Sequence, residues 1–309
     1  MLMPICDNAD HDQAPGHASQ PAPSLPEEGR GRRVLVFDSG IGGLGTVASL
    51  RAQAPALAVD FLADNAFFPY GDKPDDLLRA RIVALLEQAV AQLQPEVVIV
   101  ACNTASTLAL APLRAVLNVP VVGCVPPVRW GAKVSQTRTL GLLATPATAR
   151  RGYVQQLRDL HAADCALHVH GSALLAGQAE KAFRGGEVDS AAIEGELAAL
   201  LAMATPTSPI DVIGLGCTHY AFILPQLKGA AQRLLGAERA ARLMWLDPAP
   251  AVARQALRRL QEQAPTTLAA VQAGQGVNCF HTTGALPDEA LAKRLPELGF
   301  GANRPFTPI

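Results

Sequence analysis

The stretch VVIVACNTAST, residues 97–107, carries an unbroken apolar run directly into a cysteine and then into amide and hydroxyl side chains. A second stretch, DVIGLGCTHY at residues 211–220, repeats the arrangement. Short apolar, β-branched runs of this kind are typical of strands buried on both faces, as in parallel sheets. Cys102 and Cys217 are therefore predicted to lie where a buried strand ends and polar side chains begin.

Strand-like and helix-like segments alternate along the chain from residue 33 onward. RVLVFD (33–38) and TLGLLAT (139–145) have the β-branched, apolar character of strands, whereas DDLLRARIVALLEQAVAQL (75–93) has helical periodicity. Such alternation predicts an α/β protein with helices on both faces of parallel sheets. Because the second half repeats the pattern of the first, we expect two pseudo-symmetric, doubly wound domains with mostly parallel sheets and the active site in the cleft between them.

The expected boundaries divide the chain into three parts. Residues 1–32 are rich in proline, glycine and polar residues, which predicts a disordered N-terminal extension. Residues 33–125 together with 238–309 are expected to form the first domain, and residues 126–237 the second. No apolar stretch suits a secretory signal or a membrane span, so we expect a cytoplasmic protein.

Charge and cysteine content exclude several classes of protein. The net charge is −1 over 309 residues, which gives no electrostatic reason to bind nucleic acid or an anionic membrane. Disulfides are rare in the cytoplasm, so the cysteines are expected to be free thiols. Their spacing matches no zinc motif, so we predict no metal site. The cysteines are Cys6, Cys102, Cys124, Cys165, Cys217 and Cys279.

Several polar residues fall at predicted strand ends. In doubly wound sheets the ligand binds beyond the carboxyl ends of the strands. Asp38, Cys102, Thr145 and Cys217 all occupy such positions. We therefore expect them to share one cleft.

The segment GIGGLG, residues 40–45, supports a competing interpretation. It fits the G-x-G-x-x-G pattern between a strand and a helix, and Asp64 follows about twenty residues later, as in nicotinamide-dependent oxidoreductases. Against this, Asp38 would repel a bound pyrophosphate, and the two cysteines would have no function. An NAD(P)-dependent oxidoreductase remains an alternative, as does a non-catalytic two-domain receptor for amino acids.

The two cysteines suggest proton-transfer chemistry. A helix is predicted from about Ser106 to Leu117, and a thiol near a helix start feels the positive end of the dipole, which lowers its pKa from about 8.5. If the domains face one another, the thiols approach one small molecule from opposite sides. One thiolate could remove a proton and the opposite thiol could return one, which inverts a stereocentre.

The chain resembles bacterial glutamate racemases in five consecutive segments, over about residues 33–283. These are DSGIGGL (38–44), PYG (69–71), ACNTAS (101–106), LATPAT (143–148) and LGCTHY (215–220). The resemblance implies cofactor-independent racemisation of L-glutamate to D-glutamate for peptidoglycan synthesis. Aspartate-type and hydantoin-type racemases share parts of the pattern and remain an alternative.

The resemblance also implies roles for individual residues. Cys102 and Cys217 would be the catalytic acid/bases, with Asp38 assisting Cys102, and with His219 and Glu180 assisting Cys217. No cofactor and no metal are implied. The residues expected to hold the substrate glutamate are Asp38, Ser39, Tyr70, Gly71, Asn103, Thr104, Thr145, Thr218 and His219.

Two further features are similar to the long enterobacterial-type enzymes. These are the N-terminal extension and CVPPVRWGA at residues 124–132. That subgroup is associated with activation by a UDP-muramoyl precursor. The similarity leaves such activation open here, and it also leaves open whether the protein is a homodimer.

Overall fold

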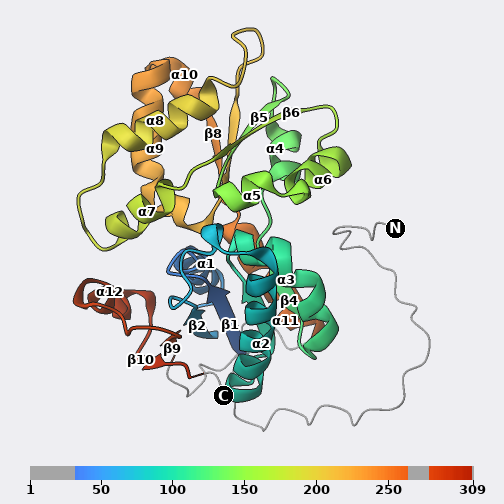
Figure 1. The fold of residues 1–309 in the computed structure, drawn as a ribbon, viewed down its shortest axis with the longest axis vertical. Coiled ribbons are helices and arrows are strands. Elements are labelled where there is room, and N and C mark those ends of the chain that lie inside the picture. Colours follow the sequence, from blue (N-terminus) through green and yellow to red (C-terminus); the bar gives the residue numbers. More distant parts are fainter. Residues whose placement is uncertain (1–31, 264–277, 308–309) are drawn as a thin grey trace, which may run out of the picture.

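The computed structural model describes residues 32–263 and 278–307, which form two α/β units joined by two chain crossings (Figure 1). The predicted disordered extension, residues 1–32, lies outside the described residues apart from Arg32. All strand pairings within the two sheets of the described chain are parallel. The predicted fold class, an α/β protein with parallel sheets, is therefore confirmed.

The first sheet has six strands in the order β10-β9-β2-β1-β3-β4. Their bounds are β1 Arg33–Asp38, β2 Ala58–Ala63, β3 Val97–Val100, β4 Val121–Gly123, β9 Cys279–Thr282 and β10 Ala302–Pro305. Strand β1 lies at the centre, with Val36 paired to Phe61 on one side and to Ile99 on the other. Because successive side chains of β1 point to opposite faces and both faces are covered, the four residues between Arg33 and Asp38 are all apolar and buried.

Helices cover both faces of this sheet. Helices α1 (Leu44–Gln53) and α11 (Ala249–Gln263) pack on the face that carries Val34 and Val36. Helices α2 (Asp75–Leu93) and α3 (Asn103–Val116) pack on the face that carries Leu35 and Phe37. The short helices η1 (Tyr70–Asp72), α12 (Glu289–Arg294) and η4 (Pro296–Leu298) lie in connecting segments.

The second sheet has four strands in the order β6-β5-β7-β8. Their bounds are β5 Thr139–Ala144, β6 Ala166–Gly171, β7 Val212–Gly216 and β8 Met244–Leu246. Helices α4 (Val128–Val134) and α6 (Gly152–His161) pack against Leu140 and Val212 on one face. The other face is covered by α7 (Leu175–Phe183), α8 (Ser190–Leu201) and α9 (Leu224–Leu235). The remaining elements are α5 (Pro146–Arg150), η2 (Thr218–Ile223) and α10 (Ala237–Arg242).

One predicted boundary needs a correction. The return of the chain to the first domain was expected at residue 238, but β8 pairs with β7 in the second sheet, with Val212 opposite Met244. The chain therefore returns only after Leu246. A three-residue strand has no sequence pattern that distinguishes it from a loop, so only its pairing shows where it belongs. The remaining domain boundaries stay predictions.

Candidate active site

The two cysteines occupy equivalent positions in the two units. Cys102 follows β3 and is the residue before α3, and Cys217 follows β7 and is the residue before η2. Helix α3 begins at Asn103 rather than near Ser106, so the polar residues directly after the cysteine form its first turn. The structure thus places both thiols at the carboxyl ends of central strands, as expected from the sequence.

These strand ends face each other across a small cavity of about 30 Å³. All predicted site residues line it except Asp38 and Glu180, which lie behind Ser39 and His219. Four lining residues were not predicted from the sequence, namely Phe68, Pro69, Ala176 and Gly216. Phe68 and Pro69 immediately precede the YG of the PYG segment, so their position beside a recognised motif was the available signal. Both sheets thus contribute walls to one site.

Ser39 connects the carboxylate of Asp38 to the thiol of Cys102. The hydroxyl of Ser39 lies 3.7 Å from the sulfur of Cys102 and donates to Oδ1 of Asp38 at 3.4 Å. The amide of Gly40 also donates to Oδ1, at 3.1 Å. Burial raises the pKa of the Asp38 carboxyl, and the nearby His219 opposes that rise. A carboxylate with a raised pKa, connected to a thiol by one hydroxyl, is suited to accept or supply a proton there.

The expected lowering of the Cys102 pKa was wrong for this closed form of the protein. Burial, and after it the negative charge of Asp38, raise the pKa of Cys102 to about 12. The loss of hydration thus outweighs the helix dipole. Cys102 is therefore a neutral thiol in this state, ready to donate a proton.

His219 lies between Cys217 and Glu180. The ring of His219 places Nδ1 3.7 Å from the sulfur of Cys217 and Nε2 3.1 Å from Oε1 of Glu180. Burial alone would lower the pKa of His219, but hydrogen bonds to Cys217 and Glu180 outweigh it and raise this pKa well above its usual value. Burial also opposes ionisation of Glu180, yet His219 and Arg184 hold the Glu180 pKa at about 2. The arrangement favours a histidinium beside the thiol.

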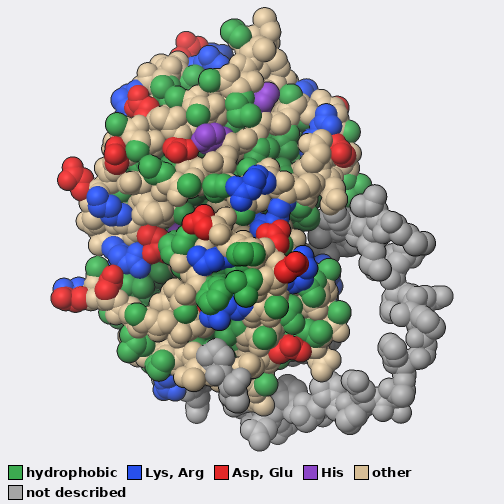
Figure 2. Space-filling model, in the orientation of Figure 1, with side chains coloured by type: hydrophobic (Ala, Val, Ile, Leu, Met, Phe, Trp, Pro, Cys, Tyr) green, Lys and Arg blue, Asp and Glu red, His purple; other side chains and the backbone are tan. Residues whose placement is uncertain are grey.

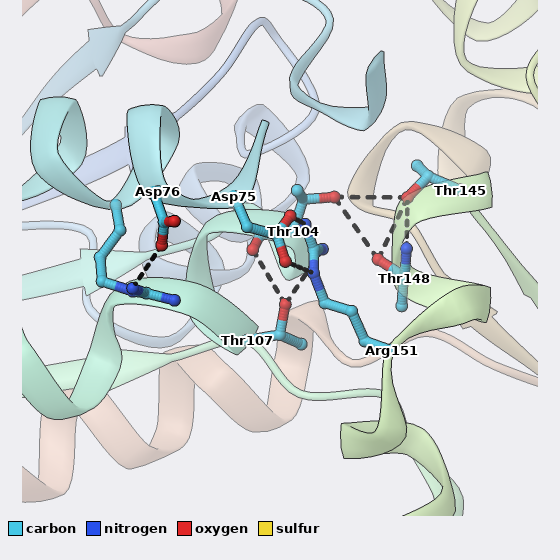
Figure 3. A network of polar contacts seen from close by, with 8 residues as sticks. Asp75, Asp76, Thr104, Thr107, Thr145, Thr148 and Arg151 are labelled. Atoms are coloured by element: carbon cyan, nitrogen blue, oxygen red, sulfur yellow. Dashed lines mark hydrogen bonds and ion pairs between the residues drawn. The ribbon is translucent and has the colours of Figure 1, made fainter. Parts of the chain in front are cut away.

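Polar groups at the cavity wall suit an amino acid. The side-chain amide of Asn103 is buried, and neither its nitrogen nor its oxygen has a hydrogen-bond partner within the described protein. The hydroxyl of Thr104 lies 3.3 Å from that of Thr145 and 3.4 Å from that of Thr148, across the domain boundary (Figure 3). Unpartnered buried amides are rare in proteins, so Asn103 points to a polar ligand.

Tyr70 and Gly71 line the wall of the cavity, and in this structure neither offers it a free side-chain hydrogen-bond donor. The hydroxyl of Tyr70 donates to Asp64 at 2.6 Å, so Tyr70 offers the cavity its ring. A Cβ atom at Gly71 would lie 3.6 Å from Cβ of Thr145, in ordinary contact with the opposite domain. The predicted substrate contacts of these two residues stay predictions.

The glycine-rich loop serves domain contact rather than a nucleotide. A Cβ atom at Gly42 would lie 2.4 Å from Oγ1 of Thr218 and 2.5 Å from Nδ1 of His219. The space in front of α1, where a pyrophosphate would bind, is thus filled by the second domain. Asp64 is fully buried, and both of its oxygens already accept hydrogen bonds from Arg81. The nicotinamide interpretation therefore has no geometric support.

Among the described residues, one mixed group of metal-type side chains exists. Asp60, Cys279 and His281 each place a ligand atom within 4.8 Å of the others. However, the oxygens of Asp60 already accept hydrogen bonds from Arg33 and from the amide of Cys279. None of the three lines the catalytic cavity, so the chemistry of the two thiols does not draw on this group.

Ion pairs connect the domains on two flanks of the cavity. Arg151 of the second domain donates to Asp75 at the start of α2, with a shortest distance of 2.6 Å, and Figure 3 shows the two side chains meeting. Arg184, after α7, pairs with Asp288, before α12, at 3.1 Å. Figure 2 shows basic and acidic side chains gathered along the middle of the molecule, where the domains meet. These contacts stabilise the closed arrangement.

Comparison with known proteins agrees with this geometry. The profile of the Asp/Glu/hydantoin racemase family matches residues 45–256. The glutamate racemase of Granulibacter bethesdensis is 46% identical over 277 residues, which cover 88% of this chain and 96% of that protein. The corresponding Shewanella loihica protein is 40% identical, with coverage of 88% and 95%.

A solved structure extends the likeness to the fold. Escherichia coli glutamate racemase, in complex with L-glutamate and the activator UDP-MurNAc-Ala, superposes with a TM-score of 0.79 at 31% identity. The match covers 90% of this chain and 99% of that chain. Sequence, fold and the paired thiols agree, and the chain belongs to the Asp/Glu/hydantoin racemase family.

Proposed function

We propose that the protein racemises glutamate, converting L-glutamate to D-glutamate and back, with Cys102 and Cys217 as the two acid/bases. The observation that carries this proposal is the pair of thiols at one cavity, each from a different domain and each with its own proton-handling partner. A proton can leave one face of the α-carbon and another can arrive at the opposite face. Relatives that are 46% and 40% identical and named glutamate racemases support glutamate as the substrate.

The protonation states on the two sides fit one direction of the reaction. Cys102, with its pKa raised to about 12, is the thiol that donates a proton. On the other side, a protonated His219 lies beside Cys217, and Cys217 is the base that removes the α-proton of L-glutamate. After turnover the roles are exchanged, and Cys102 then serves as the base for D-glutamate. The active protein thus carries one shared proton between its two cysteines.

The α-proton of an amino acid is only weakly acidic, so the site must stabilise a developing carbanion. No cofactor is predicted to share this task, which leaves it to hydrogen bonds and to the exclusion of water. We propose that the amide of Asn103 and the hydroxyls of Thr104 and Thr145 bind the substrate carboxylate and amino groups. All three residues line the cavity, and the buried amide of Asn103 has no partner within the described protein, which supports this role. Because the cavity of about 30 Å³ has room for only one or two waters, we expect the domains to open to admit glutamate.

The test is incubation with L-glutamate in heavy water, following optical rotation and α-deuterium in both enantiomers. We expect deuterium in the D-product with little early exchange into recovered L-glutamate, since the far thiol delivers a solvent-equilibrated proton. Early washout from L-glutamate that keeps pace with inversion would instead indicate a single base. L-aspartate and a hydantoin serve as competing substrates, and turnover of either in preference to glutamate would reassign the substrate.

Single replacement of either cysteine tests the two acid/base assignments. Cys102→Ala and Cys217→Ala should each lower the racemisation rate at least about 100-fold, the usual effect of losing an acid/base group. Cys165→Ala is the matched control, because Cys165 is buried but does not line the cavity. Circular dichroism checks the fold. Retention of more than about a tenth of the activity would remove that cysteine from its role.

We further propose a place for this activity in the cell. D-glutamate from the reaction would supply peptidoglycan synthesis, in the cytoplasm, which agrees with the lack of disulfides among the described cysteines. No helix in the described part of the chain combines the length and apolarity needed to cross a bilayer.

The E. coli relative was solved with UDP-MurNAc-Ala as an activator, which supports activation of this protein by a UDP-muramoyl precursor. A racemisation assay with and without that compound tests it. A homodimer stays a prediction, which sedimentation can check.

A further inference from the structure

Glu180 uses both of its carboxylate oxygens. Oε1 accepts from Nε2 of His219 at 3.1 Å, and Oε2 accepts from Arg184, which follows four residues later at the end of α7. The guanidinium of Arg184 in turn donates through Nε to Oδ2 of Asp288 at 3.1 Å. The other oxygen of Asp288 accepts from the amide of Leu291 at 2.8 Å and so caps α12. A continuous polar chain therefore runs from Cys217 to the first domain.

Only a few contacts hold Glu180 in place. Its carboxylate lines a second cavity of about 340 Å³, beside the catalytic one, whose walls include Asn65, Phe68 and Arg184. Besides Arg184 and His219, the carboxylate has one weak polar contact within the described part of the chain, with the amide of Ile41 at 3.5 Å. Without Arg184, the side chain has room to rotate into this second cavity and leave the imidazole.

We propose that Arg184 is a positioning residue of the Cys217 half of the reaction, which keeps the Glu180 carboxylate on His219 by holding its second oxygen. The proposal rests on the racemase function proposed above. Asp288 fixes the guanidinium from the opposite domain, so this support is complete only when the domains are closed. Figure 1 shows α7, which carries Glu180, directly above α12, whose start Asp288 caps.

The surroundings of Arg184 contain charges of both signs. Besides Glu180 and Asp288, the charged groups near Arg184 are Glu289, Lys293 and Arg294, which line an open pocket together with Arg184 and Asp288. Glu180 is the most buried of its ion-pair partners, with 14% side-chain exposure against 57% for Asp288. Since exposed pairs contribute little and partly buried ones more, the bond to Glu180 is the one that matters for the site.

The test compares Arg184→Met with Arg184→Lys and with a matched control, Arg294→Met. Arg294 also joins α12 to the end of α7, since it donates to the carbonyl of Phe183 at 2.5 Å and lies over that ring, but it is not bonded to Glu180. The His219 titration is followed by NMR in protein labelled with ¹³C-histidine, and the His219 signal is assigned by its loss in His219→Ala.

Arg184→Met should lower the pH at which His219 titrates by about one unit, because the imidazolium loses its carboxylate partner. It should also raise the α-deuterium isotope effect on kcat/KM for L-glutamate, with a smaller change for D-glutamate. Arg184→Lys should restore part of both effects, and Arg294→Met should show neither. In a Glu180→Gln background, Arg184→Met should change the His219 titration no further.

An unchanged or upward-shifted His219 titration in Arg184→Met would overturn the proposal, as would the same shift in Arg294→Met. The titration requires no turnover. If the wild-type protein failed to racemise glutamate while Arg184→Met still released His219, the proposed function alone would be wrong. Thermal unfolding of each variant shows that the comparison is made on folded protein.

Discussion

The hydroxyl of Thr218, the residue after Cys217, donates a hydrogen bond of 3.1 Å to Oδ2 of Asp38. Asp38 ends β1 of the first domain, and its other oxygen accepts from Ser39, which contacts the sulfur of Cys102. One buried carboxylate therefore touches the surroundings of both thiols. It raises the pKa of Cys102, and it also contributes to the raised pKa of His219 on the opposite side. The two halves of the site are electrostatically coupled through this contact.

Gly42, in the loop before α1, and Gly45, in the first turn of α1, make a matched pair of variants. Gly42→Ala places a methyl group 2.4 Å from Oγ1 of Thr218 and 2.5 Å from Nδ1 of His219, so the domains cannot close without displacing both. We expect racemisation to fall by about 100-fold, as misplacement of catalytic groups by an ångström does. At Gly45, by contrast, the new methyl group would meet only Cβ of Ala249 at 4.0 Å.

Gly45→Ala should therefore keep its activity and gain up to about 1 kcal/mol of stability, because alanine favours the helix. Steady-state racemisation and urea unfolding of the two variants make the measurement. Equal activity of Gly42→Ala and Gly45→Ala would show that close approach at Gly42 is not needed.

The raised pKa of Asp38 predicts a specific pH dependence of the unfolding free energy. Its folded-state pKa lies above the unfolded value of 3.8, so its favourable contribution is present below the unfolded pKa and is lost as the pH rises through the folded pKa. Asp38→Asn removes this loss. The unfolding free energy of the variant, relative to wild type, should rise with pH above the ordinary carboxyl range, by about 1.4 kcal/mol for each unit of pKa shift.

Urea unfolding at several pH values from about 4 to 8 measures the difference between the two proteins. The test is how the difference in unfolding free energy between the two proteins changes with pH. Its size at a single pH is not informative, because asparagine also changes the hydrogen bonds with Gly40 and Thr218. Parallel curves for the two proteins would mean that the Asp38 pKa is not raised in the folded state.

Isotope effects separate the roles of Asp38 and His219. The enantiomers of glutamate have equal free energy, so the ratio of kcat/KM in the two directions is one in every variant. A variant can still change which proton transfer limits the rate. If Cys102 deprotonates D-glutamate, Asp38→Asn should raise the α-deuterium isotope effect on kcat/KM for D-glutamate. His219→Ala should raise it for L-glutamate.

The measurement uses both α-deuterated enantiomers with each variant. Shifts of the same size in both directions, for both variants, would contradict the pairing of Asp38 with Cys102 and of His219 with Cys217. The two-thiol mechanism would survive that result. The contact between Thr218 and Asp38 predicts some cross-effect, but one smaller than the direct effect.

The ion pair between Arg81 and Asp64 should matter for stability more than for chemistry. Arg81 donates to both oxygens of Asp64 at 2.6 Å, and the Asp64 side chain is fully buried. Arg81→Met leaves a buried carboxylate without its counter-charge, which should cost about 3 kcal/mol or more of unfolding free energy. Adding Asp64→Asn should recover part of the loss, since it removes the uncompensated charge. Urea unfolding of the single and double variants measures these changes. A double variant less stable than Arg81→Met would show that the unpaired charge of Asp64 is not the cause of the loss.

The sequence by itself determined the fold class and nearly all of the site. Apolar, β-branched runs that alternate with helical periodicity can be satisfied only by strands covered on both faces, which is why the parallel sheets were predictable. The strand ends at Cys102 and Cys217 followed from the same local pattern. The short segments around them resemble one family in consecutive order. They contain most of the residues that line the cavity, although Phe68 and Ala176 lie outside them.

The tertiary structure alone decided what depends on groups far apart in the chain. The place of Met244–Leu246 in the second sheet follows from its pairing with β7, which a three-residue run cannot encode. The pKa of Cys102 was mispredicted because a helix dipole can be inferred from local sequence, whereas burial by two facing domains cannot. Likewise, Asp38 with Thr218 and Arg184 with Asp288 meet only because the two domains close on one another. Electrostatic coupling depends on distance in space, and that distance is set by packing rather than by position in the sequence.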